Sequence, residues 1–109
     1  NAEDPSNDFI PSPAKVEEFY APGGNGVRMD SHVYAGYEIS PHYDSLIGKL
    51  IVHSEDRNTT INRMQRALEE TIIEGPKTTI PFHQAIMQNS DFQAGNFHTG
   101  FLETFVYEE

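Results

Sequence analysis

The spacing of the hydrophobic residues changes near residue 56, and this change divides the chain into two halves. Before it, apolar and polar residues alternate with period two, as in Val33–Ile39, which is typical of half-buried strands. After it, apolar residues recur every three or four positions, the spacing of an amphipathic helix. These residues are Ile61, Met64, Leu68 and Ile72. Strands followed by helices indicate an α+β domain, an antiparallel β-sheet with flanking helices.

Glycine- and proline-rich turns separate the predicted strands. The turn at 21–26 lies between strands expected at Lys15–Tyr20 and Val27–Asp30. A compact apolar run at Leu46–Val52 predicts a more deeply buried strand. The polar segment Asn7–Pro13 contains two prolines and favours irregular backbone, so we expect the first regular element after it.

Two helices are predicted in the second half before Asn89. The first begins near its N-cap Asp56 and runs to about Glu74, where Gly75-Pro76 ends it. Thr78–Ile80 is predicted as a short strand, and Pro81 suits the first position of the second helix.

A loop and a short C-terminal helix are expected to complete the chain. The loop is predicted at Asn89–Gly95. The helix is predicted to follow Thr99 as its cap, with Phe101 and Phe105 on its apolar face. We detect no internal repeat and expect one domain spanning residues 1–109.

The charge of the chain argues against several classes of partner. Its formal net charge is −10 and its basic residues form no cluster, which disfavours nucleic acids and anionic membranes. No stretch approaches the roughly 18 to 20 apolar residues needed to cross a bilayer. The absence of cysteine excludes disulfides and thiolate metal sites and fits a cytoplasmic location.

Histidines and serines do not form a recognisable catalytic or metal motif. The five histidines are His32, His42, His53, His83 and His98. None of them forms the one-turn helical pair of a zinc site, so no metal site is expected. Ser31 and His32 are adjacent, which places their side chains on opposite faces of a strand and argues against a nucleophilic pair.

Arg28 is the most notable cation, because it lies just after the glycine-rich turn at 21–26. The turn lacks the lysine and hydroxyl residue of a phosphate-binding loop and is best explained as a tight turn. A lone arginine in an acidic domain most often forms an ion pair, and Asp30 and Asp44 are available partners. Lys49 also needs a partner if it is buried.

Several stretches of the chain form an ordered set of motifs. The longest are Ala21-Pro22-Gly23-Gly24-Asn25-Gly26-Val27-Arg28 and Tyr43-Asp44-Ser45-Leu46-Ile47-Gly48-Lys49-Leu50, with shorter ones at 1–5, 11–13, 30–32, 34–37, 75–79 and 101–103. In this order, and over nearly the whole chain, they resemble the C-terminal domain of biotin carboxylase. The details look more similar to the carboxylase subunit of bacterial or plastid acetyl-CoA carboxylase than to pyruvate carboxylase. By this resemblance the chain is a fragment without the upstream N-terminal and ATP-grasp domains, inactive alone.

The resemblance implies a ligase that carboxylates biotin on its carrier protein with ATP, bicarbonate and magnesium. This is the first half-reaction of acetyl-CoA carboxylase in fatty acid synthesis, in the bacterial cytoplasm or the plastid stroma. It implies that ATP and Mg²⁺ are bound mainly by the missing upstream domain. The implied partners are biotin carboxyl carrier protein, carboxyltransferase subunits and a second copy in a homodimer.

The resemblance also assigns roles to individual residues. Arg28 corresponds to the arginine that hydrogen-bonds the ureido oxygen of biotin and stabilises its enolate, with Asp44 as a possible orienter of Arg28. Thr99 corresponds to a residue that contacts adenine, and Ile51–Arg57 to a region of the dimer interface. The alternative is a noncatalytic scaffold or dimerisation module that uses its acidic surface to bind a partner.

Overall fold

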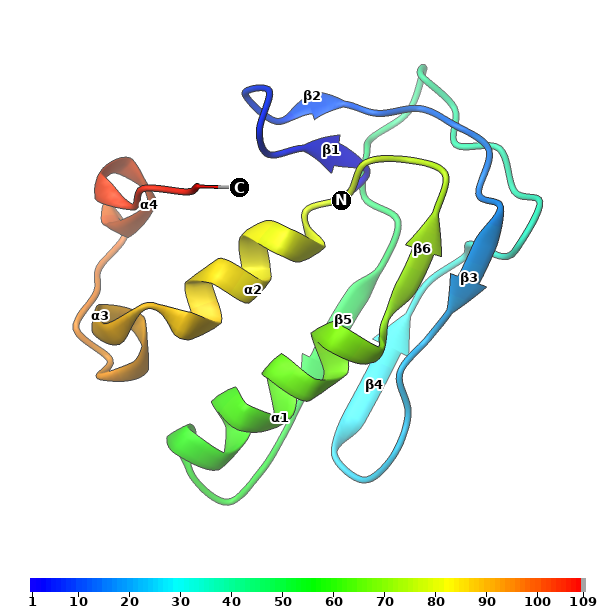
Figure 1. Cartoon of the computed structure of the whole chain (residues 1–109). Helices are drawn as coiled ribbons and strands as arrows, with labels where there is room; N and C mark the ends of the chain where they lie inside the picture. The colour runs from blue at the N-terminus through cyan, green and yellow to red at the C-terminus, as the bar shows by residue number, and fades with distance from the viewer. Residues whose placement is uncertain (109) are drawn as a thin grey trace.

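Short antiparallel strands and helices make up the structure, a computed structural model that describes residues 1–108 (Figure 1). The strands are β1 (Glu3–Asp4), β2 (Ile10–Pro11), β3 (Glu18–Tyr20), β4 (Val27–Asp30), β5 (Lys49–Val52) and β6 (Ile72–Glu74). The helices are α1 (Arg57–Glu70), α2 (Ile80–Gln88), α3 (Ser90–Gln93) and α4 (Phe101–Thr104). The predicted α+β class is confirmed.

The strands pair two by two. β1 pairs with β2, β3 with β6 and β4 with β5, and all three pairings are antiparallel, as predicted. In β4 and β5, Arg28 lies opposite Ile51 and Met29 opposite Leu50. In Figure 1 the helices α1 and α2 lie together on one side of the molecule, and β3 to β6 lie on the other.

Helix α1 ends earlier than the sequence predicts. It begins after the predicted N-cap Asp56 but stops at Glu70, and Ile72–Glu74 forms β6 instead of a last helical turn. The N–H and the hydroxyl of Thr71 still donate to the Ala67 carbonyl, at 3.1 and 2.7 Å, but the Thr71 backbone is extended, with φ −73° and ψ 124°, which ends the helix. The β-branched residues that follow suit a strand, and pairing with β3 decides between the two structures.

The predicted strand at Val33–Ile39 is wrong. The segment turns back on itself, because the Tyr37 N–H donates to the Tyr34 carbonyl at 3.0 Å and Gly36 has a φ of +97°. Both Val33 and Ile39 are nevertheless buried, so the alternation correctly identified core residues.

The two ends of the chain also depart from the prediction. β1 and β2 form a hairpin before Lys15, where no regular element was expected: β2 lies within the segment 7–13, and Asp8 and Phe9 have positive φ in the turn. Thr78–Ile80 is not a strand: Thr79 is the N-cap of α2, and Pro81 is the second residue of the helix, one position later than predicted but still in its first turn.

Near the C-terminus, the loop predicted at Asn89–Gly95 contains the short helix α3. The last helix, α4, has Gly100 as its N-cap, and not Thr99. Within residues 1–108, every helix is too short or too polar to span a bilayer.

Two groups of buried apolar residues hold these elements together. One lies among the loops and strands and consists of Ala2, Val16, Val33, Ile39 and Ile47. The other buried apolar residues lie on the helices and are Ile61, Ala67, Leu68 and Ile86. Of the predicted helical stripe, Ile61 and Leu68 are buried and Met64 is half-buried, whereas Ile72 is exposed on β6.

We expect Asp56→Ala to destabilise the chain and Asp56→Asn to retain most of the stability. The Asp56 carboxylate accepts a hydrogen bond from Thr59 N at 2.8 Å, and asparagine can replace this cap. Because that bond lowers the pKa of Asp56 below 3.8, the stabilisation is full above this pH and is lost as the pH falls further. Urea unfolding at pH 7 and pH 3 measures both effects; Glu55→Ala is the control, and equal midpoints for Asp56→Ala and Glu55→Ala at pH 7 would contradict the prediction.

Candidate functional site

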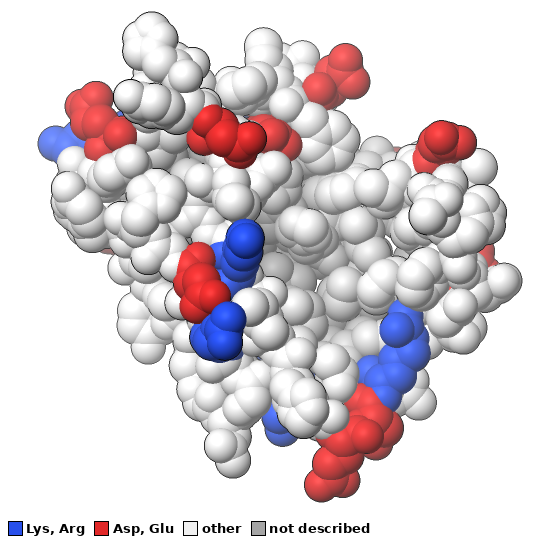
Figure 2. Space-filling model, turned by 180° about the vertical axis from the view of Figure 1, so that it is seen from behind, with Lys and Arg blue, Asp and Glu red and all other residues white. Residues whose placement is uncertain are grey.

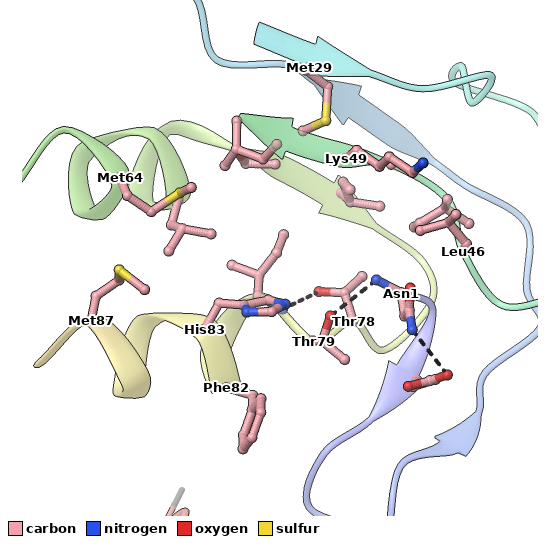
Figure 3. A pocket seen from close by; sticks show the side chains of 18 of the residues that line it. Asn1, Met29, Leu46, Lys49, Met64, Thr78, Thr79, Phe82, His83 and Met87 are labelled. Atoms are coloured by element: carbon pink, nitrogen blue, oxygen red, sulfur yellow. Dashed lines mark hydrogen bonds between the residues drawn. The ribbon is translucent and has the colours of Figure 1, made fainter. Parts of the chain in front are cut away.

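A cavity of about 590 Å³ opens between the two long helices and the strands β5 and β6 (Figure 3). Its walls are mainly apolar: Met29 comes from β4, Leu50 from β5, Ile73 from β6, Leu68 from α1 and Met87 from α2. Figure 3 shows the side chains of Met64 and Met87 facing it from the two helices. A volume of this size is within the range of ligand pockets and far above the small voids of a packed core.

The charged residues of this molecule do not concentrate on the cavity walls. A broad hollow with largely uncharged walls is visible on the face shown in Figure 2, and the Lys, Arg, Asp and Glu side chains lie scattered around it. Among the lining residues only Glu3, Lys49, His83 and the terminal ammonium of Asn1 are ionisable. The cavity is therefore suited to apolar groups.

The polar rim of the cavity is formed by the N-terminus and the start of α2. The Asn1 ammonium donates to the Thr79 hydroxyl at 3.1 Å, and the Thr79 N–H donates to the Asn1 carbonyl at 3.0 Å. Burial lowers the pKa of this ammonium below 8.0, although Glu3 and Asp44 act in the opposite direction. Burial also lowers the pKa of His83 below 6.5, and the nearby terminal charge lowers it further.

Arg28 lies outside this cavity, on the opposite face of β4. Its guanidinium makes a bidentate ion pair with Asp30, with N···O distances of 3.1 and 2.9 Å. The two side chains are 69% and 48% exposed, respectively. Because neighbouring strand residues point to opposite faces, Met29 lines the cavity while Arg28 faces solvent. The ion pair with Asp30, one of the two partners suggested by the sequence, is confirmed.

The carboxylate of Asp44 bonds to a turn and is not the ion-pair partner of Arg28. One carboxylate oxygen of Asp44 accepts the Leu46 N–H at 2.8 Å, which stabilises the turn before β5. Within residues 1–108, the acidic group that holds Arg28 is that of Asp30.

Thr99 is exposed in the loop before α4. A second cavity, of about 510 Å³, lies beside it, and its walls include Phe97, His98 and Phe101. Thr99 itself is not among the described residues that line this cavity.

The segment Ile51–Arg57 lies mostly at the surface, with only Val52 and Ser54 half-buried. Ile51 is 42% exposed, on the same face of the sheet as Arg28. Arg57 is also exposed, and its guanidinium lies 4.9 Å from the Phe92 ring centre and 5.3 Å from that of Phe97.

The structure brings no catalytic triad together at Ser31 and His32. The Ser31 hydroxyl donates to the Ile47 carbonyl at 2.5 Å, and the His32 ring packs edge-on against Tyr37. Among residues 1–108, no group of three or more His, Asp or Glu is placed to hold a metal ion.

The cavity is the feature that sequence reasoning missed. Its apolar walls come from a run and a helical stripe that were correctly recognised as hydrophobic, Leu46–Val52 and Ile61–Leu68. Thr79, which is 6% exposed and holds the N-terminus, carried no sequence signal, because its partner is 78 residues away in the chain.

Comparison with known proteins identifies the family. The family model for the biotin carboxylase C-terminal domain matches residues 1–104. Biotin carboxylase from Nostoc sp. is 58% identical over 103 residues, which cover 94% of this chain and 23% of that protein. A pyruvate carboxylase subunit from Methanothermobacter thermautotrophicus is 57% identical over 105 residues, 96% of this chain and 21% of that protein.

A solved structure of a relative has the same fold as this chain over the whole length of this chain. The biotin carboxylase domain dimer of Hydrogenobacter thermophilus 2-oxoglutarate carboxylase, in complex with MgADP, ADP and bicarbonate, is 47% identical, with a TM-score of 0.94. The match covers 100% of this chain and 25% of that one. The chain thus spans about a quarter of the length of the relatives it matches. Since the family model matches residues 1–104 and the solved fold matches the whole chain, the chain belongs to the biotin carboxylase C-terminal domain family.

Proposed function

We propose that the chain is the C-terminal part of an enzyme that carboxylates biotin with ATP and bicarbonate. The observation that carries the proposal is the 58% identity to the Nostoc biotin carboxylase over 94% of the chain. The complex of the Hydrogenobacter relative with MgADP and bicarbonate supports the same substrates. Biotin on a carrier protein would be the acceptor of the carboxyl group.

The binding of ATP and Mg²⁺ is proposed to lie in the parts of the longer protein outside these residues. The chain corresponds to less than a quarter of the Nostoc enzyme, so most of a complete active site lies elsewhere in that relative. The contribution of this chain would be a folded wall against which those parts pack.

The wider pathway is proposed to be acetyl-CoA carboxylation in fatty acid synthesis, with carboxyltransferase subunits as partners. Matches to chloroplast biotin carboxylases from Populus trichocarpa and Arabidopsis thaliana, each 49% identical, support a bacterial cytoplasmic or plastid location. The match to a pyruvate carboxylase component supports pyruvate as a second candidate acceptor. Supplying purified carboxyltransferases for acetyl-CoA and for pyruvate to the full-length protein distinguishes the two.

The test of the proposed function is an assay of the full-length protein. ATP hydrolysis that depends on both bicarbonate and free biotin is the expected result, and residues 1–109 alone should show none. Full-length protein that hydrolyses no ATP under these conditions, while folded and pure, would favour the noncatalytic scaffold.

Two roles are open to Arg28. The resemblance assigns it to the enolate oxygen of biotin, where a guanidinium stabilises developing negative charge. Its exposure and the exposed Ile51 beside it also leave Arg28 free for a contact with a second copy. The relative from Hydrogenobacter is a dimer, which supports the second role.

We expect Arg28→Gln in the full-length protein to lower turnover by about 100-fold at unchanged mass, since one lost donor to an oxyanion costs that much. Sedimentation at several concentrations and biotin-dependent ATP hydrolysis measure the two effects, with Lys15→Gln as the control for an exposed cation. Weakened self-association with near-normal turnover would instead support a contact with a second copy.

A further inference from the structure

The large cavity is open to solvent, yet its walls are mainly apolar side chains of the kind that a folded domain normally covers. Protein interiors are packed as densely as organic crystals, and voids larger than a water molecule are few. Here a volume of about 590 Å³ separates Leu50 and Ile73 on the strands from Leu68 and Met87 on the helices. Each of these side chains therefore lacks contacts on the side that faces the cavity, which points to an occupant absent from these residues.

The backbone of the first two residues already has the form of a central strand. Asn1 uses its N–H and carbonyl groups on one side, both toward Thr79. The N–H and carbonyl groups of Ala2 point to the other side of the strand. The N–H donates to the Ser45 carbonyl at 2.8 Å, and the carbonyl accepts from Ser12 N at 2.8 Å. Alternation of the bonding side from one residue to the next is the pattern of an extended strand with neighbours on both edges.

The direction of this strand leads along β5. Ala2 bonds Ser45, which lies just before β5, so continuing the chain backward from Ala2 passes alongside Ser45 toward Val52 in antiparallel sense. In Figure 3 Asn1 lies at the end of the cavity where Leu46 and Lys49 are found. Asn1 and Glu3 also line the cavity.

β5 offers a free edge at this place. His53 N donates to the Gly26 carbonyl at 2.8 Å, so the facing pair Gly26 and His53 is hydrogen-bonded. In an antiparallel ladder such pairs alternate with unbonded ones, and the next bonded pair is Arg28 with Ile51. The N–H and carbonyl groups of Leu50 therefore point away from β4, to the outer edge of β5, where no other strand pairs with β5 within residues 1–108.

We propose that in the full-length protein the segment directly preceding Asn1 lies in this cavity as an extended strand, antiparallel to β5 and hydrogen-bonded to its outer edge. The inference rests on the proposed function, in which the chain is one part of a longer carboxylase. A second copy is the less suitable occupant, because Asn1 already lines the cavity and the backbone of Ala2 is already bonded beside the start of β5. The strand joins this domain to the rest of the enzyme through its core.

Amide hydrogen exchange of the full-length protein tests the proposal. With ¹⁵N-leucine and ¹⁵N-isoleucine labelling, the Leu50 amide should exchange at least about 100-fold more slowly than an unpaired amide, as expected for a bonded central strand. The Ile51 amide, bonded to Arg28 across β4, is the internal control and should be protected in every sample. Free exchange of Leu50 beside a protected Ile51 would overturn the proposal.

The occupant is identified in the same sample by nuclear Overhauser effects from the Leu50 amide, which require no substitution. Contacts to the residues directly preceding Asn1 support the proposal, whereas contacts to any other segment, or to the second copy in a mixed-isotope sample, overturn it. Proline in place of single residues of that preceding segment removes one donor and should restore exchange of Leu50 but not of Ile51. If the Leu50 amide stays protected from exchange in every proline variant, the proposal is overturned.

The proposed function can fail independently of this inference. Biotin-dependent ATP hydrolysis measured on the same protein reports the activity, and the exchange of Leu50 reports the occupant. An active enzyme with an unprotected Leu50 rejects only the strand, and an inactive protein with a protected Leu50 rejects only the function.

Discussion

Gly75→Ala is expected to lower the free energy of unfolding by about 3 kcal/mol, a large fraction of the stability of a domain of this size. Gly75 has a φ of +120°, which L-residues rarely adopt, and it directly follows β6. A Cβ atom at this position would overlap the backbone carbonyl of Lys15. Because the Glu17 N–H is bonded to the Glu74 carbonyl at 2.8 Å, the two backbones cannot separate without breaking the β3–β6 junction.

Urea unfolding of the 109-residue chain, followed by circular dichroism, measures this effect. Gly23→Ala is the matched control, since a Cβ at Gly23 has no heavy atom of the described residues within 4 Å and the residue is in the 21–26 turn. We expect the control to change the midpoint little. Equal midpoints for the two variants would show that the Gly75 backbone has room to adjust.

Ile47→Ala is the second substitution expected to have a large effect, again of about 3 kcal/mol, from lost burial and the cavity that is left behind. Ile47 is 4% exposed and packs with Ala2, Val16, Val33 and Ile39. These residues come from segments far apart in the chain, so the site has little freedom to collapse around a smaller side chain.

The control for this substitution is Ile51→Ala, which removes the same atoms from a side chain that is 42% exposed. We expect it to cost less than about 1 kcal/mol. Thermal unfolding of both variants in the same buffer provides the comparison. A cost for Ile51→Ala as large as that for Ile47→Ala would mean that the exposed face of β5 is buried in a dimer, which sedimentation would reveal.

Local chemistry was sufficient to predict several elements. Asp56 as an N-cap, Pro81 in the first turn of α2 and the strand at Val27–Asp30 all depend on interactions within a few residues, and all three are confirmed. Alternation at 33–39 identified Val33 and Ile39 as buried, although it predicted the wrong backbone. The side chain of a residue can be buried whether the residue lies in a turn or in a strand. For this segment, burial was therefore easier to predict than backbone conformation.

Errors arose where a distant partner decides the structure. Ile72–Glu74 fits the end of a helix by spacing, and pairing with β3, more than 50 positions away, makes it a strand. The hairpin of β1 and β2 contains prolines and polar residues that argue against strands, and Ser12 N bonding to the Ala2 carbonyl helps to hold it together.

For the candidate site, the sequence identified the ionic partner of Arg28 but not its surroundings. Two residues of separation on a strand suffice to bring Arg28 and Asp30 together on one face. That this face lies away from the cavity, and that Asp44 serves the turn at Leu46, depends on how β4 and β5 pack against the helices.

The sequence by itself determined the family, the α+β class and the residues that are apolar, because these follow from residue identity and from spacing within short segments. Only the tertiary structure decided which strands pair, where α1 ends and that the apolar surfaces of β5, β6, α1 and α2 surround a cavity. Pairing and cavities arise from contacts between segments far apart in the chain. The free energy of such contacts depends on the positions of both partners, which no short stretch of sequence contains.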